Sequence, residues 1–191
     1  VESGPALGVI PADFDRDGLI DLAVPHRDGG QSHVYFNGGK ATFSDRRRVP
    51  FGPPDATIRM AEAADLDGDG FLDLVTIDER RGVAVYFGRK DGTFAPGEAI
   101  DDGKVTPYAL AVADLDGDGR IDILVGHVTA PSTAFVNDGT GHRFAPVHFG
   151  DGRGTVYGFA VADLDRDGRL DIAVARSDAP NVVYFASPRR P

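Results

Sequence analysis

Short apolar segments rich in Val, Ile, Phe and Tyr recur along the chain, and stretches rich in Gly, Asp and Pro separate them. The segments are too short to show a helical period, and their residue types and flanking turns are typical of β-strands. Many of them are apolar at every position instead of alternating with polar residues. This pattern predicts an all-β fold whose sheets are packed on both faces.

The apolar segments follow one another in the same order four times. The first segment of each unit lies at 7–12, 58–64, 108–113 and 157–162, the second at 22–24, 74–77, 123–125 and 172–174, and the third at 33–36, 83–87, 133–136 and 182–185. Three units continue with a Gly-containing turn, which indicates a hairpin. The turn leads to a fourth segment at 41–43, 93–95 and 143–145.

Units of about 50 residues with four short strands each are the sequence signature of β-propeller blades. We therefore predict a single β-propeller domain over 1–191, with blades at approximately 1–52, 53–103, 104–153 and 154–191 plus the N-terminal residues. The fourth unit ends where its fourth strand would begin. Either residues 1–6 supply this strand and close a four-bladed ring, or the chain is an arc of a larger propeller that another copy or further sequence completes.

An acidic motif, Asp-x-Asp-x-Asp-Gly-x-[Ile/Leu]-Asp, lies between the first and second segments of each unit. Its first aspartates, at 13, 65, 114 and 163, are 52, 49 and 49 residues apart. The chain has 26 Asp but only 4 Glu, and 16 of the Asp belong to these motifs. Recurrence at a nearly fixed spacing identifies a repeat protein, and short carboxylates gathered in turns indicate metal sites.

The motif matches the order of oxygen ligands in a calcium loop. Its first, third and fifth positions supply carboxylates, Gly at the sixth permits the turn, and the variable seventh offers its carbonyl. The ninth position is again Asp, whereas the twelfth, where an EF-hand has Glu, is Val or Thr. Hard oxygen ligands favour Ca²⁺ over zinc or copper, so we predict up to four Ca²⁺, one per unit. The expected ligands are Asp13, Asp15, Asp17, Leu19, Asp21, Asp65, Asp67, Asp69, Phe71, Asp73, Asp114, Asp116, Asp118, Arg120, Asp122, Asp163, Asp165, Asp167, Arg169 and Asp171.

The acidic motif, together with the apolar residues that follow it, resembles the FG-GAP/VCBS repeat of integrin-α-type propellers and of many secreted bacterial proteins. The resemblance extends over nearly the whole chain. It implies a β-propeller with Ca²⁺ in the loop between the first and second strands of each blade. Integrin-type propellers resemble seven-bladed rings, whereas this chain has four units.

A second set of candidate residues lies where propellers usually bind ligands, in the channel or on the face opposite the metal loops. Four of these residues follow the second segment of their unit, three lie at the start of a first segment, and one lies within a first segment. If the blades pack around one axis, these residues line one end of the channel. The predicted ligand-binding residues are His26, Arg59, Glu62, Asp78, Tyr108, His127, Tyr157 and Arg176.

Three functions fit this set of residues. The chain is predicted to be a binding module that recognises a carbohydrate or a protein, with structural Ca²⁺. The alternatives are a lyase on acidic polysaccharide, with His26 or His127 acting beside Tyr108 or Tyr157 and Arg59, and a purely structural or engineered repeat scaffold. The sequence has no nucleophile-elbow, Walker or zinc-protease motif, which favours the binding module over an enzyme.

The amino-acid composition excludes several kinds of site and partner. The chain has no Cys, which excludes a disulfide scaffold and a Cys-ligated metal site, and no apolar run long enough to span a membrane. Its net charge of −10 argues against nucleic acid as a partner, because phosphates would be repelled. Extracellular calcium is concentrated enough to fill weak sites, so we expect a secreted protein whose signal peptide is absent from this chain. A homo-oligomer that completes the propeller is a further expectation.

Overall fold

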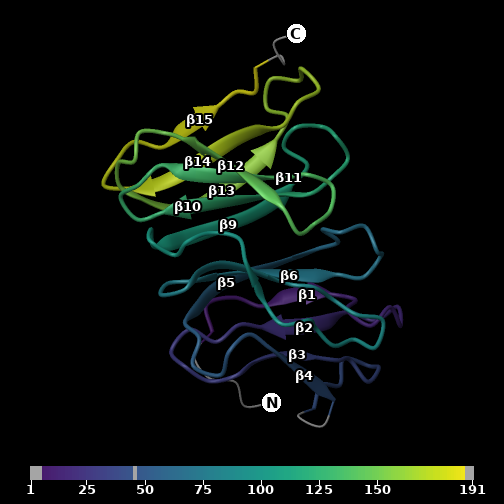
Figure 1. Ribbon diagram of the computed structural model, residues 1–191. Coiled ribbons are helices and arrows are strands. Elements are labelled where there is room, and N and C mark those ends of the chain that lie inside the picture. Colours follow the sequence, from purple (N-terminus) through teal and green to yellow (C-terminus); the bar gives the residue numbers. More distant parts are fainter. Residues whose placement is uncertain (1–5, 45–46, 188–191) are drawn as a thin grey trace.

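The computed structural model describes residues 6–44 and 47–187, and within these ranges the chain forms fifteen strands and no helix. The strands make four antiparallel sheets, each built from strands that are consecutive in sequence (Figure 1). The all-β prediction is thus confirmed, and each sheet is one blade. None of the described residues forms a helix of the length and hydropathy that a membrane crossing requires.

The blades are numbered here from the N-terminus. Blade 1 comprises β1 (Ile10–Ala12), β2 (Asp21–Val24), β3 (Ser32–Tyr35) and β4 (Arg48–Phe51), and blade 2 comprises β5 (Ile58–Ala64), β6 (Asp73–Asp78), β7 (Gly82–Tyr86) and β8 (Glu98–Ala99). Blade 3 comprises β9 (Pro107–Ala113), β10 (Asp122–His127), β11 (Ser132–Asn137) and β12 (Phe144–Phe149), and blade 4 comprises β13 (Thr155–Ala162), β14 (Asp171–Ser177) and β15 (Val182–Tyr184).

The fourth strands of blades 1 and 2 begin later than predicted. Residues 41–43 form no strand, because the turn continues through Lys40 and Ala41, both with a φ of 53° in the left-handed region. In blade 2 the predicted segment contributes only an isolated bridge from Phe94 to Gly88, and β8 follows it. In blade 3 the predicted segment and β12 overlap.

The four blades form an open arc. In Figure 1 they follow one another from blade 1 near the N-terminus to blade 4 near the C-terminus, and these two blades lie at opposite ends. Blade 4 has three strands, so β15 lies at the edge of its sheet. Of the segment expected to complete it, residues 1–5 lie outside the described residues. Closure of a four-bladed ring by residues 1–6 therefore stays a prediction. The separation of blades 1 and 4 among the described residues favours the alternative, an arc of a larger propeller.

Apolar clusters between successive blades form the core. Between blades 2 and 3, for example, Val75 and Val85 pack with Ile123 and Phe135, and all four side chains are buried. A second cluster joins blades 1 and 2, and a smaller one joins blades 3 and 4. Because an inner blade meets a neighbour on each side, its strands are apolar on both faces, as the sequence pattern predicted. The first strands of successive blades contact one another along the inner side of the arc.

Candidate functional site

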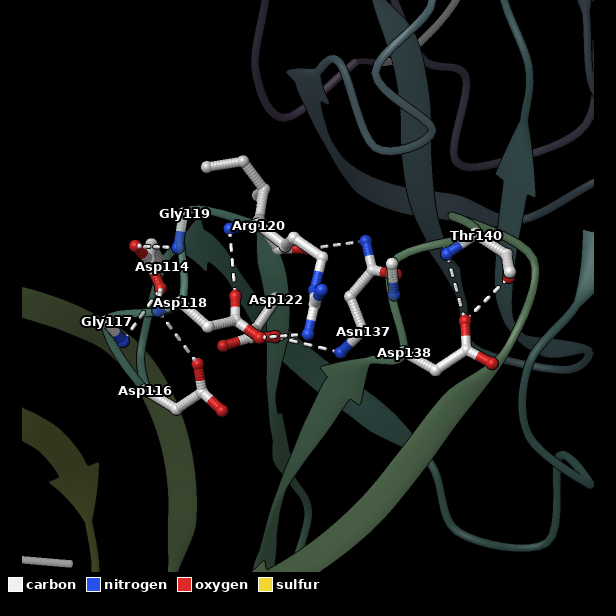
Figure 2. A network of polar contacts seen from close by, with 12 residues as sticks. Asp114, Asp116, Gly117, Asp118, Gly119, Arg120, Asp122, Asn137, Asp138 and Thr140 are labelled. Carbon is white, nitrogen blue, oxygen red and sulfur yellow. Dashed lines mark hydrogen bonds and ion pairs between the residues drawn. The ribbon is translucent and has the colours of Figure 1, made fainter.

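Each acidic motif forms the loop between the first and second strands of its blade. In blade 3 the loop runs from Asp114, directly after β9, to Asp122, the first residue of β10. Figure 2 shows this loop curled around its own carboxylates: Gly117 and Gly119 donate backbone N–H bonds of 2.8 Å to Asp114, and Arg120 donates one of 2.9 Å to Asp118. The bond from the sixth-position Gly to the first aspartate recurs in every loop at 2.8–3.0 Å.

Backbone conformation explains which residues occupy two loop positions. The sixth-position glycines all have φ between 84° and 87°. The fourth position is also left-handed, with φ of 75° at Gly68, 74° at Gly117, 61° at Arg16 and 65° at Arg166. Side chains with a Cβ resist this conformation, so each arginine there stores some strain that the rest of the loop must offset.

Carboxylate oxygens converge in every loop. In blades 2, 3 and 4 the first, third and ninth aspartates each place one oxygen within 4.8 Å of the others, and in blade 1 the first, third and fifth do so. Negative charges this close repel one another unless a cation or a donor lies between them. Arg47 partly fills this role in blade 1, with ion pairs of 2.9 Å to Asp15 and 3.2 Å to Asp17. This donor set fits a hard divalent cation held by oxygen.

The ninth aspartate has a second role that the sequence did not reveal. In every blade one of its oxygens accepts the N–H of the second loop residue, and the other accepts an N–H at or just beyond the end of the third strand. All eight bonds are 2.8–2.9 Å long, and the side chains are 0–1% exposed. This carboxylate therefore joins the loop to the second and third strands of its blade. The four residues are Asp21, Asp73, Asp122 and Asp171.

Burial changes the acidity of these carboxyl groups. It raises the pKa of Asp73 to about 6, against the opposing effect of the N–H bonds from Leu66 and Gly88. Burial likewise raises the pKa of Asp21 and of Asp122. A bound cation would oppose this effect, because it stabilises the ionised form.

Asn137 couples the acidic loops of two blades. Its side-chain amide donates to the Leu66 carbonyl in the blade 2 loop at 2.9 Å, while its backbone N–H donates to Asp122 in its own blade at 2.9 Å. Its side-chain oxygen accepts from Gly141, where an added Cβ would lie 2.7 Å from the Cα of Asp67. The hairpin after β11 thus lies directly against the preceding loop. Its Asn-Asp-Gly sequence suggested a turn but not this contact.

The predicted residues after the second strands do not form one site. Asp78 accepts hydrogen bonds from the backbone and hydroxyl of Thr57, at 2.8 and 2.7 Å, and His127 Nδ1 lies 2.8 Å from the Pro131 carbonyl. Arg176 pairs at 2.5 Å with Asp151, in the segment that connects blade 3 to blade 4. Each of these side chains therefore supports a loop close to it.

His26 is the fourth residue of this set, and it is buried without a partner for either ring nitrogen. Burial lowers the pKa of its imidazole, and the positive charge of Arg48 lowers it further. Glu62 is half-buried, and burial raises its pKa. Although Glu62 lies in β5, as Arg59 does, Arg59 forms its ion pair with Glu79 instead.

Three predicted residues do come together on the inner side of the arc. The Arg59 guanidinium lies 3.3 Å from the centroid of the Tyr108 ring, and the rings of Tyr108 and Tyr157 meet edge to face at 4.9 Å. Glu79, which the sequence did not single out, pairs at 3.0 Å with both Arg59 and Arg27. This inner cluster, defined as Arg27, Arg59, Glu79, Tyr108 and Tyr157, draws on all four blades.

The structure is thus part of a β-propeller built from repeated antiparallel blades, each with an acidic loop after its first strand. The profile of the FG-GAP-like repeat matches residues 13–76, 65–125 and 129–174. These segments include most of the chain, which therefore belongs to the FG-GAP-like repeat family. A search of curated proteins gave no match.

Among solved structures, the chain is similar to a lectin of Agrocybe aegerita, reported for specific recognition of non-reducing terminal N-acetylglucosamine. The TM-score is 0.62 at 23% sequence identity, and the alignment covers 87% of this chain and 46% of the lectin. The similarity supports the propeller fold. The chain spans less than half of the length of that lectin.

The Asp73→Asn variant tests the structural role of the ninth aspartate. In the presence of a chelator we expect it to lower the free energy of unfolding by about 1–3 kcal/mol, because the amide nitrogen faces a backbone N–H that loses its acceptor. Asp69→Asn, in an exposed residue of the same loop, is the control and should change the stability by less than about 0.5 kcal/mol. Urea denaturation provides the measurement, and equal effects of the two variants would refute the role.

A pH series tests the burial of His26. Its folded pKa lies below the ordinary value, so the unfolded chain binds a proton first as the pH falls below about 6.5, and stability is lost. The His26→Leu variant should lose less unfolding free energy than the wild type between pH 7 and pH 5. The difference between the two should equal the free energy linked to protonation of one histidine. Thermal melts at constant calcium would show this, and identical slopes would contradict it.

Proposed function

We propose that the protein is a secreted, calcium-stabilised propeller module that binds carbohydrate at the inner cluster. The observation that carries the proposal is the contact series Arg59, Tyr108 and Tyr157, in which a cation and two aromatic rings lie side by side across three blades. Further blades, from a second copy or from more sequence, would complete the ring around this cluster. The family and the lectin neighbour are consistent with a binding module.

The chemistry of the cluster suits a sugar. An aromatic ring offers an apolar face for the C–H side of a pyranose, and charged groups beside it offer hydrogen bonds to hydroxyls. Tyr157 is 54% exposed, so its ring is available to a ligand. Arg59 is held by the Tyr108 carbonyl at 3.0 Å and by Glu79, which fixes its guanidinium before any ligand arrives.

Calcium has a structural role in this proposal. One ion per loop, up to four in all, would neutralise the converging carboxylates and hold the first and second strands of each blade together. Sites of extracellular modules are about half filled at roughly 10⁻⁴–10⁻³ M Ca²⁺, a range that suits a secreted protein and not the cytosol. Secretion is therefore part of the same proposal.

The polysaccharide lyase remains the second candidate from the sequence, but no observation favours it. It requires a histidine beside Tyr108 or Tyr157, whereas the described hydrogen bonds connect neither His26 nor His127 to these tyrosines. A structural scaffold would leave the exposed ring of Tyr157 without a role. We therefore favour the binding module.

Calcium addition is the direct test of the loops. We expect Ca²⁺ to raise the melting temperature and excess EDTA to lower it, because the ion binds the folded loops only. Asp116→Asn should weaken this response, whereas Asp28→Asn, an exposed carboxylate outside the loops, should leave it unchanged. Calorimetry measures both the shift and the number of ions bound. A melting curve that neither calcium nor chelator moves would refute the role of the loops.

Glycan arrays followed by titration calorimetry test the inner cluster. With a sugar that binds the wild type, Tyr157→Ala should lower the affinity at least about tenfold, or about 1.4 kcal/mol, while Tyr157→Phe should retain most of it because the ring face remains. Val147→Ala, which alters an exposed residue of β12, is the control.

Two results would overturn the carbohydrate proposal. One is the absence of binding to any glycan by calcium-loaded protein. The other is binding that Tyr157→Ala does not affect. An assay for unsaturated uronic acid products run on the same samples would show whether the lyase must be reinstated.

A further inference from the structure

The outward face of blade 4, directed away from blade 3, is apolar and exposed. Three of its side chains are Leu164, Val183 and Phe185, which are 48%, 43% and 59% exposed. Alanines of β13 and β14 lie around them, and a shallow groove crosses this face between Gly158, Ala175 and Val183. A contiguous apolar surface of this kind marks an interaction site in a protein that remains in solution.

The same positions are buried in blades 1 and 2. Leu164 corresponds to Phe14 of blade 1 and Leu66 of blade 2, since each follows the first aspartate of its loop. By the strand registers, Val183 corresponds to Val34 and Val85, and Phe185 to Phe36 and Phe87. All six equivalents are 0–7% exposed and belong to the clusters in which their blade packs on the next. Blade 4 thus exposes the face on which, in blades 1 and 2, the next blade packs.

Blade 1 exposes the opposite kind of face. Val9, which is 51% exposed, corresponds to Ala61 and Leu110, both buried against the preceding blade. Leu22 corresponds to Leu74 and Ile123, which are fully buried in the same contacts. Leu7, also on this blade, is 57% exposed. The two ends of the arc therefore carry the two halves of one contact that the chain forms three times internally.

We propose that the outward face of blade 4 packs on blade 1 of a second copy of this chain, and the reverse, so that two arcs form one eight-bladed ring. The argument is continuity: the new contacts repeat the blade-to-blade packing already present between blades 1 and 2, 2 and 3, and 3 and 4. Such a head-to-tail contact gives a closed dimer if the rotation closes and a filament if it does not. Eight blades lie within the usual range for propellers.

The second copy also completes the inner side of the ring. Leu7, Arg59, Tyr108 and Tyr157 occupy equivalent sequence positions, six residues before the first aspartate of each acidic loop. In the ring, Leu7 of the second copy follows Tyr157 just as Tyr157 follows Tyr108. Leu7 of the second copy would then lie next to the inner cluster, on the side where one copy alone has no neighbouring blade. The assembly itself does not depend on sugar binding.

Sedimentation and light scattering in saturating calcium test the assembly. The chain has a mass of 20.2 kDa, and we expect a particle of twice that mass. Val183→Glu on blade 4 and Val9→Glu on blade 1 should each raise the dissociation constant of the dimer at least about tenfold, since either charge would be buried in the contact. Val147→Glu, a change of the same kind at an exposed strand position, should leave the dimer intact.

Mixing the two variants distinguishes this geometry from any other dimer. Each variant retains the face that the other has lost, so the mixture should form a 1:1 pair through one intact contact. A dimer in which two blade 4 faces meet would be unaffected by Val9→Glu. In the mixture this variant would then pair with itself, and no 1:1 pair with Val183→Glu would form. A monomeric wild type, a filament, or a mixture that stays monomeric would overturn the proposal. Circular dichroism and the calcium-dependent melt of each variant confirm that the blades are folded.

Discussion

A buried carboxylate with two backbone donors is the interaction on which each blade depends. The ninth aspartate of the motif begins the second strand, accepts one N–H from the loop before it and another from the end of the third strand. Burying a charge is costly unless it is hydrogen-bonded, and here both oxygens are satisfied by neutral donors. The loop geometry, and with it the convergence of the other carboxylates, follows from this anchored residue.

The packing of blades has a different physical origin. It rests mainly on apolar side chains that each blade presents on both faces, and a few hydrogen bonds between blades, such as the one from Asn137 to the Leu66 carbonyl, add to it. The polar groups lie at the two ends of the first strands. The acidic loop follows one end, and the inner cluster lies at the other. Because the two groups are separate, the acidic loops can stay alike in all blades while the residue at the opposite end varies. That residue is Leu7, Arg59, Tyr108 or Tyr157.

The periodic features of the fold could be predicted from the sequence, because repetition makes local signals mutually consistent. The blades, the acidic loops and the first three strands of each unit were of this kind. The fourth strands of blades 1 and 2 were misplaced, since the left-handed Lys40 and Ala41 extend a turn that composition alone does not delimit. The partners of Asn137 and Glu79 also escaped prediction, because contacts between blades depend on how the sheets are stacked.

The contact between a hairpin and the loop of the preceding blade makes the four acidic loops unequal. Gly141 of blade 3 lies against Asp67, and an added Cβ at Gly92 of blade 2 would lie 3.6 Å from the side chain of Asp15. The loop of blade 4 lies at the free end of the arc, with no following blade to supply such a cover. If the loops hold calcium as proposed, a single arc would therefore release the ion of the blade 4 loop more readily than the ions of the two loops that a hairpin covers.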